Sequence, residues 1–263
     1  MTLFWIIVFC LVGGLLSVIV AASLLVFPIS WRRRLVPHLL SFAIGALLGA
    51  AFLVILPHAF ENPKLDVHVL SAAVLLGILG FFLLEKMVLW RHCHSHSCDA
   101  HTPQEHIDSG KIRSQVALIV IGDGIHNFID GIMIAAAFLT DFHLGVATSI
   151  ALAAHEIPQE VGDFAILLNA GITRGKALLY NALSGLTTVL GGLLGYFALG
   201  LMQQASPYVM AVAAASFIYI AVADLIPNLH QRTELRETVK QVILILLGVA
   251  TIWLAHFYIP HSH

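Results

Sequence analysis

The stretch ALLYNALSGLTTVLGGLLGYFALGLMQQASPYVMAVAAASFIYIAVA, residues 177–223, contains no Asp, Glu, Lys, Arg or His. It is more than twice as long as the roughly 20 apolar residues that one membrane-spanning helix needs. The segment from Met202 to Pro207 divides it, because this segment is polar and carries a helix-breaking proline. We therefore expect two spanning helices here, near residues 177–201 and 207–229.

Further charge-poor runs of similar length lie near residues 3–27, 36–60, 67–90, 114–139, 143–169 and 239–259. The first is longer than the ~7–15 apolar residues of a signal peptide core, so we expect a retained helix. The chain is 59% hydrophobic and only 11% charged, against about 25% charged residues in soluble domains. The sequence predicts an all-α polytopic membrane protein with eight transmembrane helices. We expect one domain over residues 1–263, with membrane lipid as a partner and no nucleic-acid partner.

The basic residues are distributed unevenly between the expected connections. Twelve of the thirteen lysines and arginines fall in alternate connections, or at their borders, and Lys64 is the exception. Cytoplasmic loops of membrane proteins carry such an excess of positive charge. With an even number of helices, this asymmetry predicts that both termini lie outside.

Two short segments suggest an internal repeat. The second expected helix ends in Leu56-Pro57-His58 and the seventh in Ile226-Pro227-Asn228. The two helices run in opposite directions, as the halves of inverted repeats do in many transporters.

The connection at residues 91–113 is rich in histidine and cysteine. Such tracts bind metal without a packed fold, and this one matches no fixed zinc-finger spacing. We expect a cytosolic loop that collects metal ions, with a polar linker as the alternative. The chain has three cysteines, an odd and small number that does not indicate a disulfide framework. The candidate loop ligands are His92, Cys93, His94, His96, Cys98 and His101.

Two of the expected helices carry polar side chains along one face. In the helix near 114–139 these are Asp123, His126, Asn127 and Asp130. In the helix near 143–169 these are His155, Glu156, Gln159, Glu160 and Asp163. At about 100° per residue, the first four fit a sector about 100° wide.

Ionisable groups inside a membrane are costly, so they face partners or water. Neither helix contains a lysine or arginine in its core, and a bound divalent cation would supply the missing positive charge. Imidazole together with carboxylate and amide oxygens suits zinc, iron or manganese better than copper(I). Gly122, Gly124 and Gly131 would permit close approach of a neighbouring helix. The pattern therefore predicts an intramembrane metal site between the fourth and fifth helices.

The motifs His126-Asn-Phe-Ile-Asp-Gly131 and His155-Glu-Ile-Pro-Gln-Glu-Val-Gly-Asp163 resemble the ZIP (Zrt/Irt-like) family of metal transporters. They are most similar to the branch whose motifs read HNFxDG and HEIPxExGD. The resemblance implies eight helices, external termini, a histidine-rich cytosolic loop, a possible homodimer and a metal centre with two subsites. One implied subsite consists of His126, Asp130, His155 and Gln159. The other consists of Asn127, Glu156 and nearby positions.

The chain departs from this branch at two places. Many members have histidine where Gln159 stands, which predicts an altered metal preference. Some relatives contribute a carboxylate from the sixth helix, where this chain offers only Asn181 and Ser184. We therefore expect the second subsite to be weaker or absent.

Other polar residues are candidates for the metal pathway. The resemblance suggests that His58 binds metal near the outer mouth, with an interfacial histidine as the alternative. Asp224 either lines the inner exit or caps its helix. We expect His143 in a solvated loop and His256 at the membrane interface. The full set of candidate pathway residues is His58, Asp123, Glu160, Asp163, Asn181 and Asp224.

These features predict a transporter, not an enzyme, that moves a divalent cation into the cytoplasm as substrate and needs no cofactor. Zinc is the first choice of cargo, with iron or manganese next. An intramembrane zinc protease is one alternative, although Gln159 replaces the second histidine of an H-E-x-x-H motif. A metal sensor that does not transport is another, and a cation-diffusion exporter fits poorly because such exporters usually have six spans. Compact loops favour a prokaryotic plasma membrane, with an organellar membrane as the alternative.

Overall fold

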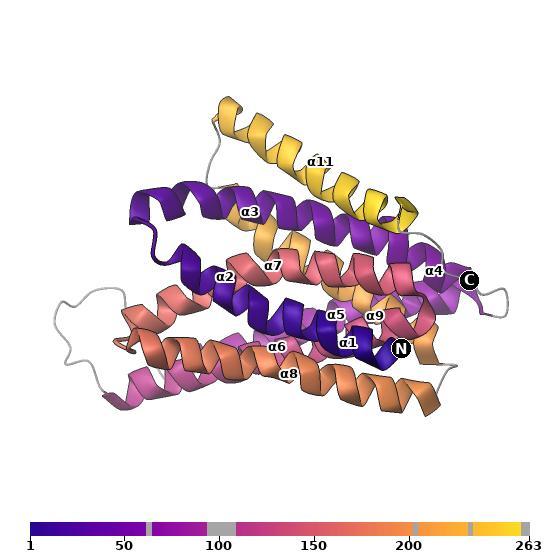
Figure 1. Ribbon diagram of the computed structural model, residues 1–263, viewed down its shortest axis with the longest axis horizontal. Helices are drawn as coiled ribbons and strands as arrows, with labels where there is room; N and C mark the ends of the chain where they lie inside the picture. The colour runs from indigo at the N-terminus through magenta and orange to yellow at the C-terminus, as the bar shows by residue number, and fades with distance from the viewer. Residues whose placement is uncertain (62–64, 94–108, 202–204, 231–233, 259–263) are drawn as a thin grey trace.

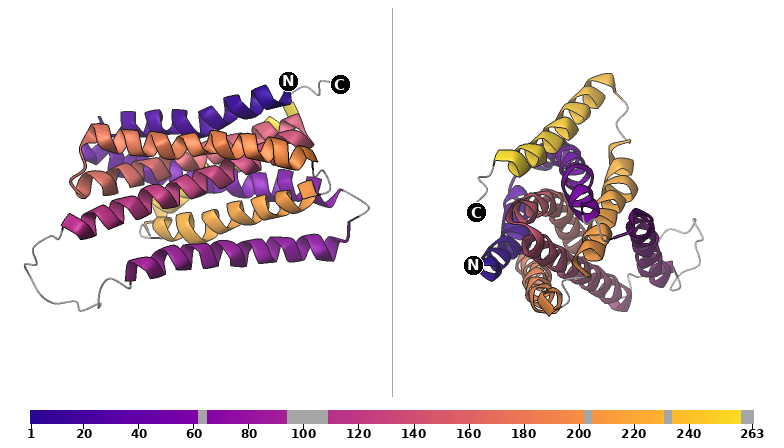
Figure 2. Two further views of the ribbon diagram at one scale, coloured as in Figure 1. Left: turned by 90° about the horizontal axis from the view of Figure 1, so that it is seen from below. Right: turned by 90° about the vertical axis from the view of Figure 1, so that its right-hand side faces the viewer.

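The protein is a bundle of long, roughly parallel helices, seen from three directions in Figures 1 and 2. This computed structural model describes residues 1–61, 65–93, 109–201, 205–230 and 234–258. Three helical segments are each divided by a π-helical turn. They are α1 (Thr2–Leu11), η1 (Val12–Leu16) and α2 (Ser17–Leu24); α3 (Ile29–Gly49), η2 (Ala50–Ile55) and α4 (Leu56–Phe60); and α9 (Ser206–Tyr219), η4 (Ile220–Leu225) and α10 (Ile226–Leu229). The undivided helices are α5 (Val67–Cys93), α6 (Ser109–Thr140), α7 (Phe142–Asn169), α8 (Arg174–Leu201) and α11 (Leu235–Tyr258).

The prediction of an all-α polytopic membrane protein is confirmed. Seven of the described helical segments are long and apolar enough to cross a membrane, and each overlaps a run expected from the sequence. Several extend beyond those runs: the second segment begins at Ile29 rather than near residue 36. A helix need not end where the apolar sequence ends, because its backbone hydrogen bonds continue equally well outside the hydrocarbon region.

The eighth segment, α7, falls below that threshold although it is 28 residues long. The polar residues from His155 to Asp163 lower its hydropathy. Its surroundings compensate, because α7 contacts α2, α3, α6, α8 and α11 and buries sixteen of its own residues. The helix that carries His155, Glu156, Glu160 and Asp163 is therefore enclosed by other helices.

Glycines allow pairs of helices to approach at backbone distance. A methyl group at Gly131 of α6 would overlap the backbone carbonyl oxygen of Thr188 in α8. Only Gly131 of the three α6 glycines singled out in the sequence has this role. A methyl group at Gly122 would meet nothing within 4 Å, and one at Gly124 would meet only side chains, at 3.6 and 3.8 Å.

The repeated proline segments share a local geometry. The six-residue π-helical turn η2 directly precedes Leu56-Pro57-His58, and η4, also of six residues, directly precedes Ile226-Pro227-Asn228. Proline lacks the N–H group that would donate to the carbonyl oxygen of the residue four positions earlier. A π-helical turn is a common way for a helix to accommodate this missing hydrogen bond. The two segments run in opposite directions through the bundle (Figure 1), which supports the internal repeat inferred from the sequence.

A tight turn joins α6 to α7. Asp141 caps α7, because its carboxylate Oδ1 accepts hydrogen bonds from the backbone N–H groups of His143 at 2.8 Å and Leu144 at 3.0 Å. Partial burial alone would raise the pKa of Asp141, but these hydrogen bonds and the nearby His143 ring lower it below its usual value. The expectation that His143 lies in a solvated loop is wrong. Since α7 begins at Phe142, His143 belongs to its first turn and is only 3% exposed.

Candidate metal centre

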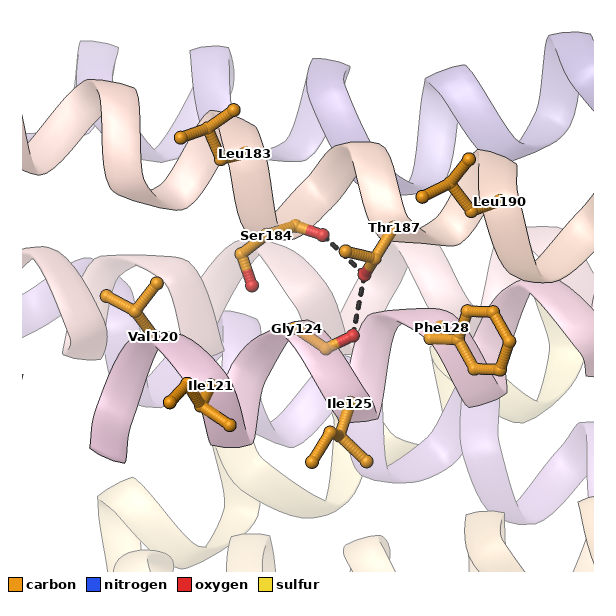
Figure 3. Close-up of a pocket in the computed structure, with 9 residues that line it drawn as sticks. All are labelled: Val120, Ile121, Gly124, Ile125, Phe128, Leu183, Ser184, Thr187 and Leu190. Carbon is orange, nitrogen blue, oxygen red and sulfur yellow. Dashed lines mark hydrogen bonds between the residues drawn. The ribbon is translucent and has the colours of Figure 1, made fainter. Parts of the chain in front are cut away.

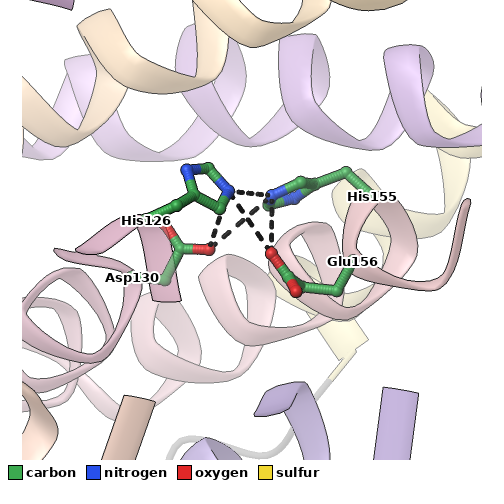
Figure 4. Close-up of side chains that lie close together, drawn as sticks. All are labelled: His126, Asp130, His155 and Glu156. Carbon is green, nitrogen blue, oxygen red and sulfur yellow. Dashed lines mark hydrogen bonds and ion pairs between the residues drawn. The ribbon is translucent and has the colours of Figure 1, made fainter. Parts of the chain in front are cut away.

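The side chains of α6 and α7 meet in the interior of the bundle. α6 supplies His126 and Asp130, which are one helical turn apart, and α7 supplies the adjacent His155 and Glu156. Figure 4 shows the four side chains converging on one point. Two antiparallel helices joined by a tight turn thus bring together two motifs that are 29 residues apart.

The donor-atom distances that involve a histidine are close to those of a tetrahedral metal site. The Nε2 atoms of His126 and His155 are 3.2 Å apart, and each lies 3.3 Å from Oε1 of Glu156. Oδ2 of Asp130 lies 3.7 Å from the first nitrogen and 3.6 Å from the second. Four donors placed about 2.0–2.1 Å from a tetrahedral zinc ion would be about 3.3–3.4 Å from one another. The observed distances match that requirement closely.

The charges of this cluster are unbalanced. Asp130 and Glu156 are each 2% exposed, and their carboxylate oxygens have no hydrogen-bond partner among the described residues. Their close contacts are with the two imidazoles, and within the described part of the chain neither pairs with a lysine or arginine. Buried carboxylates without compensation are strongly unfavourable. A divalent cation at the centre would satisfy both.

A second group of acids adjoins the first. Carboxylate oxygens of Asp123, Glu156 and Glu160 lie within 4.8 Å of one another, and Glu160 is fully buried. Glu156 belongs to both groups, so the two positions for a cation would share one carboxylate. The arrangement resembles the two subsites implied by the family motifs, but with Asp123 and Glu160 in the second one.

The two amides of the motifs face Asp123 rather than the four-donor cluster. The NH2 groups of Asn127 and Gln159 donate to Oδ1 of Asp123 at 3.0 and 3.3 Å. The amide oxygen of Asn127 accepts a 2.7 Å hydrogen bond from the hydroxyl of Thr188 in α8. In this arrangement, the amide oxygen of Asn127 is therefore engaged by a protein donor. The ligand roles implied for Asn127 and Gln159 stay predictions.

Thr188 was not found by sequence reasoning. It is 2% exposed and lies on α8 directly after Thr187. The sequence indicates a role for Thr188 only weakly. Two consecutive threonines in an otherwise apolar helix suggest that one of them points inward to a polar partner, but not which one or which partner. Its hydroxyl fixes the direction in which the Asn127 amide points.

We expect Thr188→Val to perturb the centre without a change in side-chain shape. The substitution leaves the buried oxygen of Asn127 without a donor, which costs about 1–3 kcal/mol. Thermal unfolding in detergent should show a lower midpoint, and the KM for zinc uptake should change several-fold. Thr188→Ser keeps the hydroxyl and serves as the control. Equal midpoints and equal KM values for the valine and wild-type proteins would contradict the assigned role.

A cavity of about 440 Å³ extends from the cluster toward one end of the bundle. In α6, Asp123 precedes His126, and in the antiparallel α7, Asp163 follows His155, so both acids lie on the same side of the cluster. That side faces the start of α8, whose first turn carries Arg174 and Lys176. The polar lining residues are Asp123, His126, Gln159, Asp163, Tyr219 and Asp224.

Of the remaining predicted residues, Asn181 adjoins the second group of acids, because it is buried in α8 with its side chain beside Glu160. His58 lies away from both groups, on α4 beside the ring of His256. The prediction for the loop ligands stays open. His92 and Cys93 end α5, where side chains are not described, and the other four lie outside the described residues.

A separate cavity of about 400 Å³ lies between α6 and α8 (Figure 3). Its lining is mainly aliphatic and includes Ile121, Ile125 and Leu190. The hydroxyl of Thr187 is satisfied by the backbone carbonyl oxygens of Gly124 at 2.6 Å and Ser184 at 2.7 Å. Because none of the described residues that line it has a titratable side chain, this cavity is not a candidate for metal binding.

The fold and the cluster together define a polytopic membrane protein with a histidine–carboxylate centre inside the bundle. A family profile described as ZIP Zinc transporter matches residues 1–255. The chain belongs to this family of transporters, and the class of intramembrane protease is set aside on that ground.

Individual relatives agree with the family assignment. The chain is 32% identical to Zinc transporter ZIP13 of Pongo abelii over 247 residues, which cover 88% of this chain and 69% of the relative. It is 32% identical to Zinc transporter YKE4 of Saccharomyces cerevisiae over 240 residues, covering 81% and 68%. It is 41% identical to Zinc transporter ZIP6 of Homo sapiens over 136 residues, covering 52% and 18%. The match therefore spans less than a fifth of that longer relative.

Proposed function

We propose that this protein moves divalent cations, zinc in the first place, across the membrane through the cluster formed by His126, Asp130, His155 and Glu156. The observation that carries the proposal is the spacing of these four donors, 3.2 to 3.7 Å for the pairs that include a histidine, around two buried carboxylates. The names of the relatives support zinc as cargo, with iron and manganese as alternatives. The ion is the substrate, and no cofactor is invoked.

The chemistry of the donor groups makes metal binding, and with it the proposed transport, depend on pH. Imidazoles bind metal in their neutral form and carboxylates in their ionised form, so metal binding releases any protons that these groups hold. Water ligands on the incoming ion are exchanged for the two nitrogens and two oxygens. Release requires at least one of these donors to move away, and Asp123 and Glu160 offer the next oxygens along the path.

The basic residues support a proposal for the direction of transport. The acid-lined cavity lies on the side of the cluster that faces Arg174 and Lys176. The excess of lysine and arginine in the connections at that end supports a cytoplasmic location for it. We therefore propose that the ion leaves the cluster through this cavity into the cytoplasm and that both termini lie outside.

The protein is an integral membrane protein, and two finer predictions accompany the proposal. A prokaryotic plasma membrane is inferred from the compact loops alone, and the relatives named above are eukaryotic and give it no support. A homodimer is inferred from the family resemblance alone. Both stay predictions.

Flux measurements separate transport from metal sensing. Purified protein is reconstituted into sealed vesicles that contain a zinc-sensitive dye, and zinc is added outside. A carrier gives continued filling until the gradient is dissipated, whereas a sensor gives only the stoichiometric binding of added zinc. Absence of net influx from correctly inserted, zinc-binding protein would refute the proposed function.

Gln159→His should shift the preference among metals. The substitution adds an imidazole next to the cluster and removes the amide that donates to Asp123. Imidazole favours zinc over manganese, which prefers oxygen ligands. In uptake assays with competing ions, excess manganese should inhibit zinc uptake less in the variant than in wild type, by several-fold in the inhibitory concentration. An unchanged inhibition curve would show that residue 159 does not influence the choice of metal. Gln159→Asn keeps an amide side chain and provides the control.

A further inference from the structure

An apolar groove runs along the outside of the bundle between α6 and α8. It is the cavity of about 400 Å³ drawn in Figure 3, and we call it the α6–α8 groove. Its side chains are turned outward, because Ile121 and Ile125 of α6 are 60% and 51% exposed. Leu183 and Leu190 of α8 are 52% and 59% exposed. All four lie in segments that are long and apolar enough to cross a membrane, so the groove opens toward lipid.

The dimensions of the groove limit what can fill it. Leu183 and Leu190 are about two helical turns apart, so this stretch of the groove is about 10 Å long. A volume of about 400 Å³ over that length gives an average width of roughly 7 Å. A helix with its side chains has a diameter of about 10–12 Å. The groove therefore admits a single hydrocarbon chain but not a helix of a second copy of this protein.

A basic residue lies on the same face of α8 as the groove. Lys176 is exposed and stands seven residues before Leu183 and fourteen before Leu190. At about 100° per residue, these three positions differ by at most about 40° around the helix axis. Arg174 stands nine residues before Leu183, which places it on the opposite face. Of these two cations in the first turn of α8, only Lys176 is aligned with the groove.

The separation of Lys176 from the groove matches the dimensions of a phospholipid. Leu183 lies about 10 Å from Lys176 along the helix axis. The headgroup region of a bilayer is roughly 5–8 Å thick on each side of the hydrocarbon core. A phosphate group beside Lys176 would therefore have its acyl chains at the level of Leu183 and Leu190. The lysine ammonium group attracts phosphate as a compact point charge.

We propose that a membrane phospholipid with an anionic headgroup binds here, with one acyl chain in the α6–α8 groove and its phosphate beside Lys176. The acyl chain would contact Ile125, which also lines the acid-lined cavity. The bound lipid would thus pack against a wall between that cavity and the bilayer. In the proposed orientation the site faces the cytoplasmic leaflet, where anionic lipids are concentrated. Binding of the lipid itself depends neither on that orientation nor on transport.

Native mass spectrometry of the full-length protein in detergent tests the headgroup contact. Phosphatidylglycerol or phosphatidylcholine with identical acyl chains is added stepwise, and the fraction of protein that carries one lipid gives the dissociation constant. We expect tighter binding of phosphatidylglycerol. Lys176→Gln should weaken its binding about fivefold, the usual effect of one basic residue on the attraction of anionic lipid. Arg174→Gln removes the same charge from the opposite face and should leave binding nearly unchanged.

Leu190→Trp tests the contact with the acyl chain. The larger side chain would fill part of the groove and should weaken the binding of both lipids several-fold. Leu246→Trp places the same side chain at a site on α11 where leucine is 61% exposed, and it should have no effect. Similar values for wild type and Leu190→Trp, or equal weakening by Lys176→Gln and Arg174→Gln, would overturn the proposal.

The mass spectra also report the competing occupant. A wild-type dimer that Leu190→Trp dissociates would show that a second copy covers the groove, and it would refute lipid binding there. Because no metal is added, the outcome is independent of the proposed function. Loss of zinc flux with intact lipid binding would refute transport alone, and flux without the expected lipid binding would refute only the lipid site.

Discussion

Zinc uptake by the double variant His126→Ala with Asp130→Ala should fall to the level of protein-free vesicles. The substitutions remove one imidazole and one carboxylate, so only His155 and Glu156 of the four donors would remain. In the intact cluster, the donor atoms of each pair that includes a histidine are 3.2 to 3.7 Å apart. Two ligands from one helix cannot enclose a tetrahedral ion. Uptake of radioactive zinc into proteoliposomes measures the loss.

The control must show that the fold survives. Asp130 is a buried carboxylate without a hydrogen-bond partner among the described residues, so its removal relieves an unfavourable charge in the metal-free protein. We therefore expect the double variant to elute as wild type does in size-exclusion chromatography. His230→Ala, which alters an exposed histidine after α10, should transport normally. Undiminished uptake by the folded double variant would disprove the assigned site.

Gly131→Ala should strongly destabilise the bundle. The added methyl group would overlap the carbonyl oxygen of Thr188 and approach the backbone nitrogen of Gly192 to 2.6 Å. Overpacking costs about 1–3 kcal/mol where side chains can adjust. Here the obstacles are backbone atoms of α8, so α6 and α8 must separate along their contact, and we expect a cost at or above the top of that range.

Gly122→Ala is the matched comparison, since it places the same methyl group on the same helix. A methyl group there meets nothing within 4 Å, and alanine favours helix more than glycine does, by about 1 kcal/mol. Thermal unfolding in detergent should therefore show a large drop for Gly131→Ala and no drop for Gly122→Ala. Similar midpoints for the two variants would contradict the close contact between α6 and α8.

The sequence was sufficient for the helical architecture and for the choice of the two central helices. Long apolar runs indicate membrane-spanning segments directly. In lipid such a segment must be helical, because its backbone polar groups have to be hydrogen-bonded within the segment. The grouping of His126 with Asp130 follows from helical periodicity. The grouping of His155 with Glu156 does not, because adjacent residues of a helix point about 100° apart, and the family motifs implied that the two belong to different subsites. Periodicity alone, however, does not show which face of α6 meets which face of α7.

What the sequence did not provide depends on contacts between distant segments. An amide side chain can direct either its oxygen or its nitrogen toward a neighbour. For Asn127, the acceptor oxygen of Asp123 on one side and the hydroxyl of Thr188 on α8 on the other decide the orientation together. His143 was expected in a solvated loop, yet the cap that Asp141 forms places it in a buried first turn. Gly131 differs from Gly122 only through its neighbour on α8.

The enclosed position of α7 has a consequence for how the chain is made. A helix that is too polar to partition into lipid by itself must enter the bilayer together with a partner. Only Asp141 separates α7 from α6, which is one of the segments apolar enough to cross a membrane. The two helices would therefore leave the insertion machinery as a hairpin, with their polar faces turned toward each other from the start. The residues proposed to bind the ion are then shielded from lipid during biogenesis by the same contact that later holds them in place.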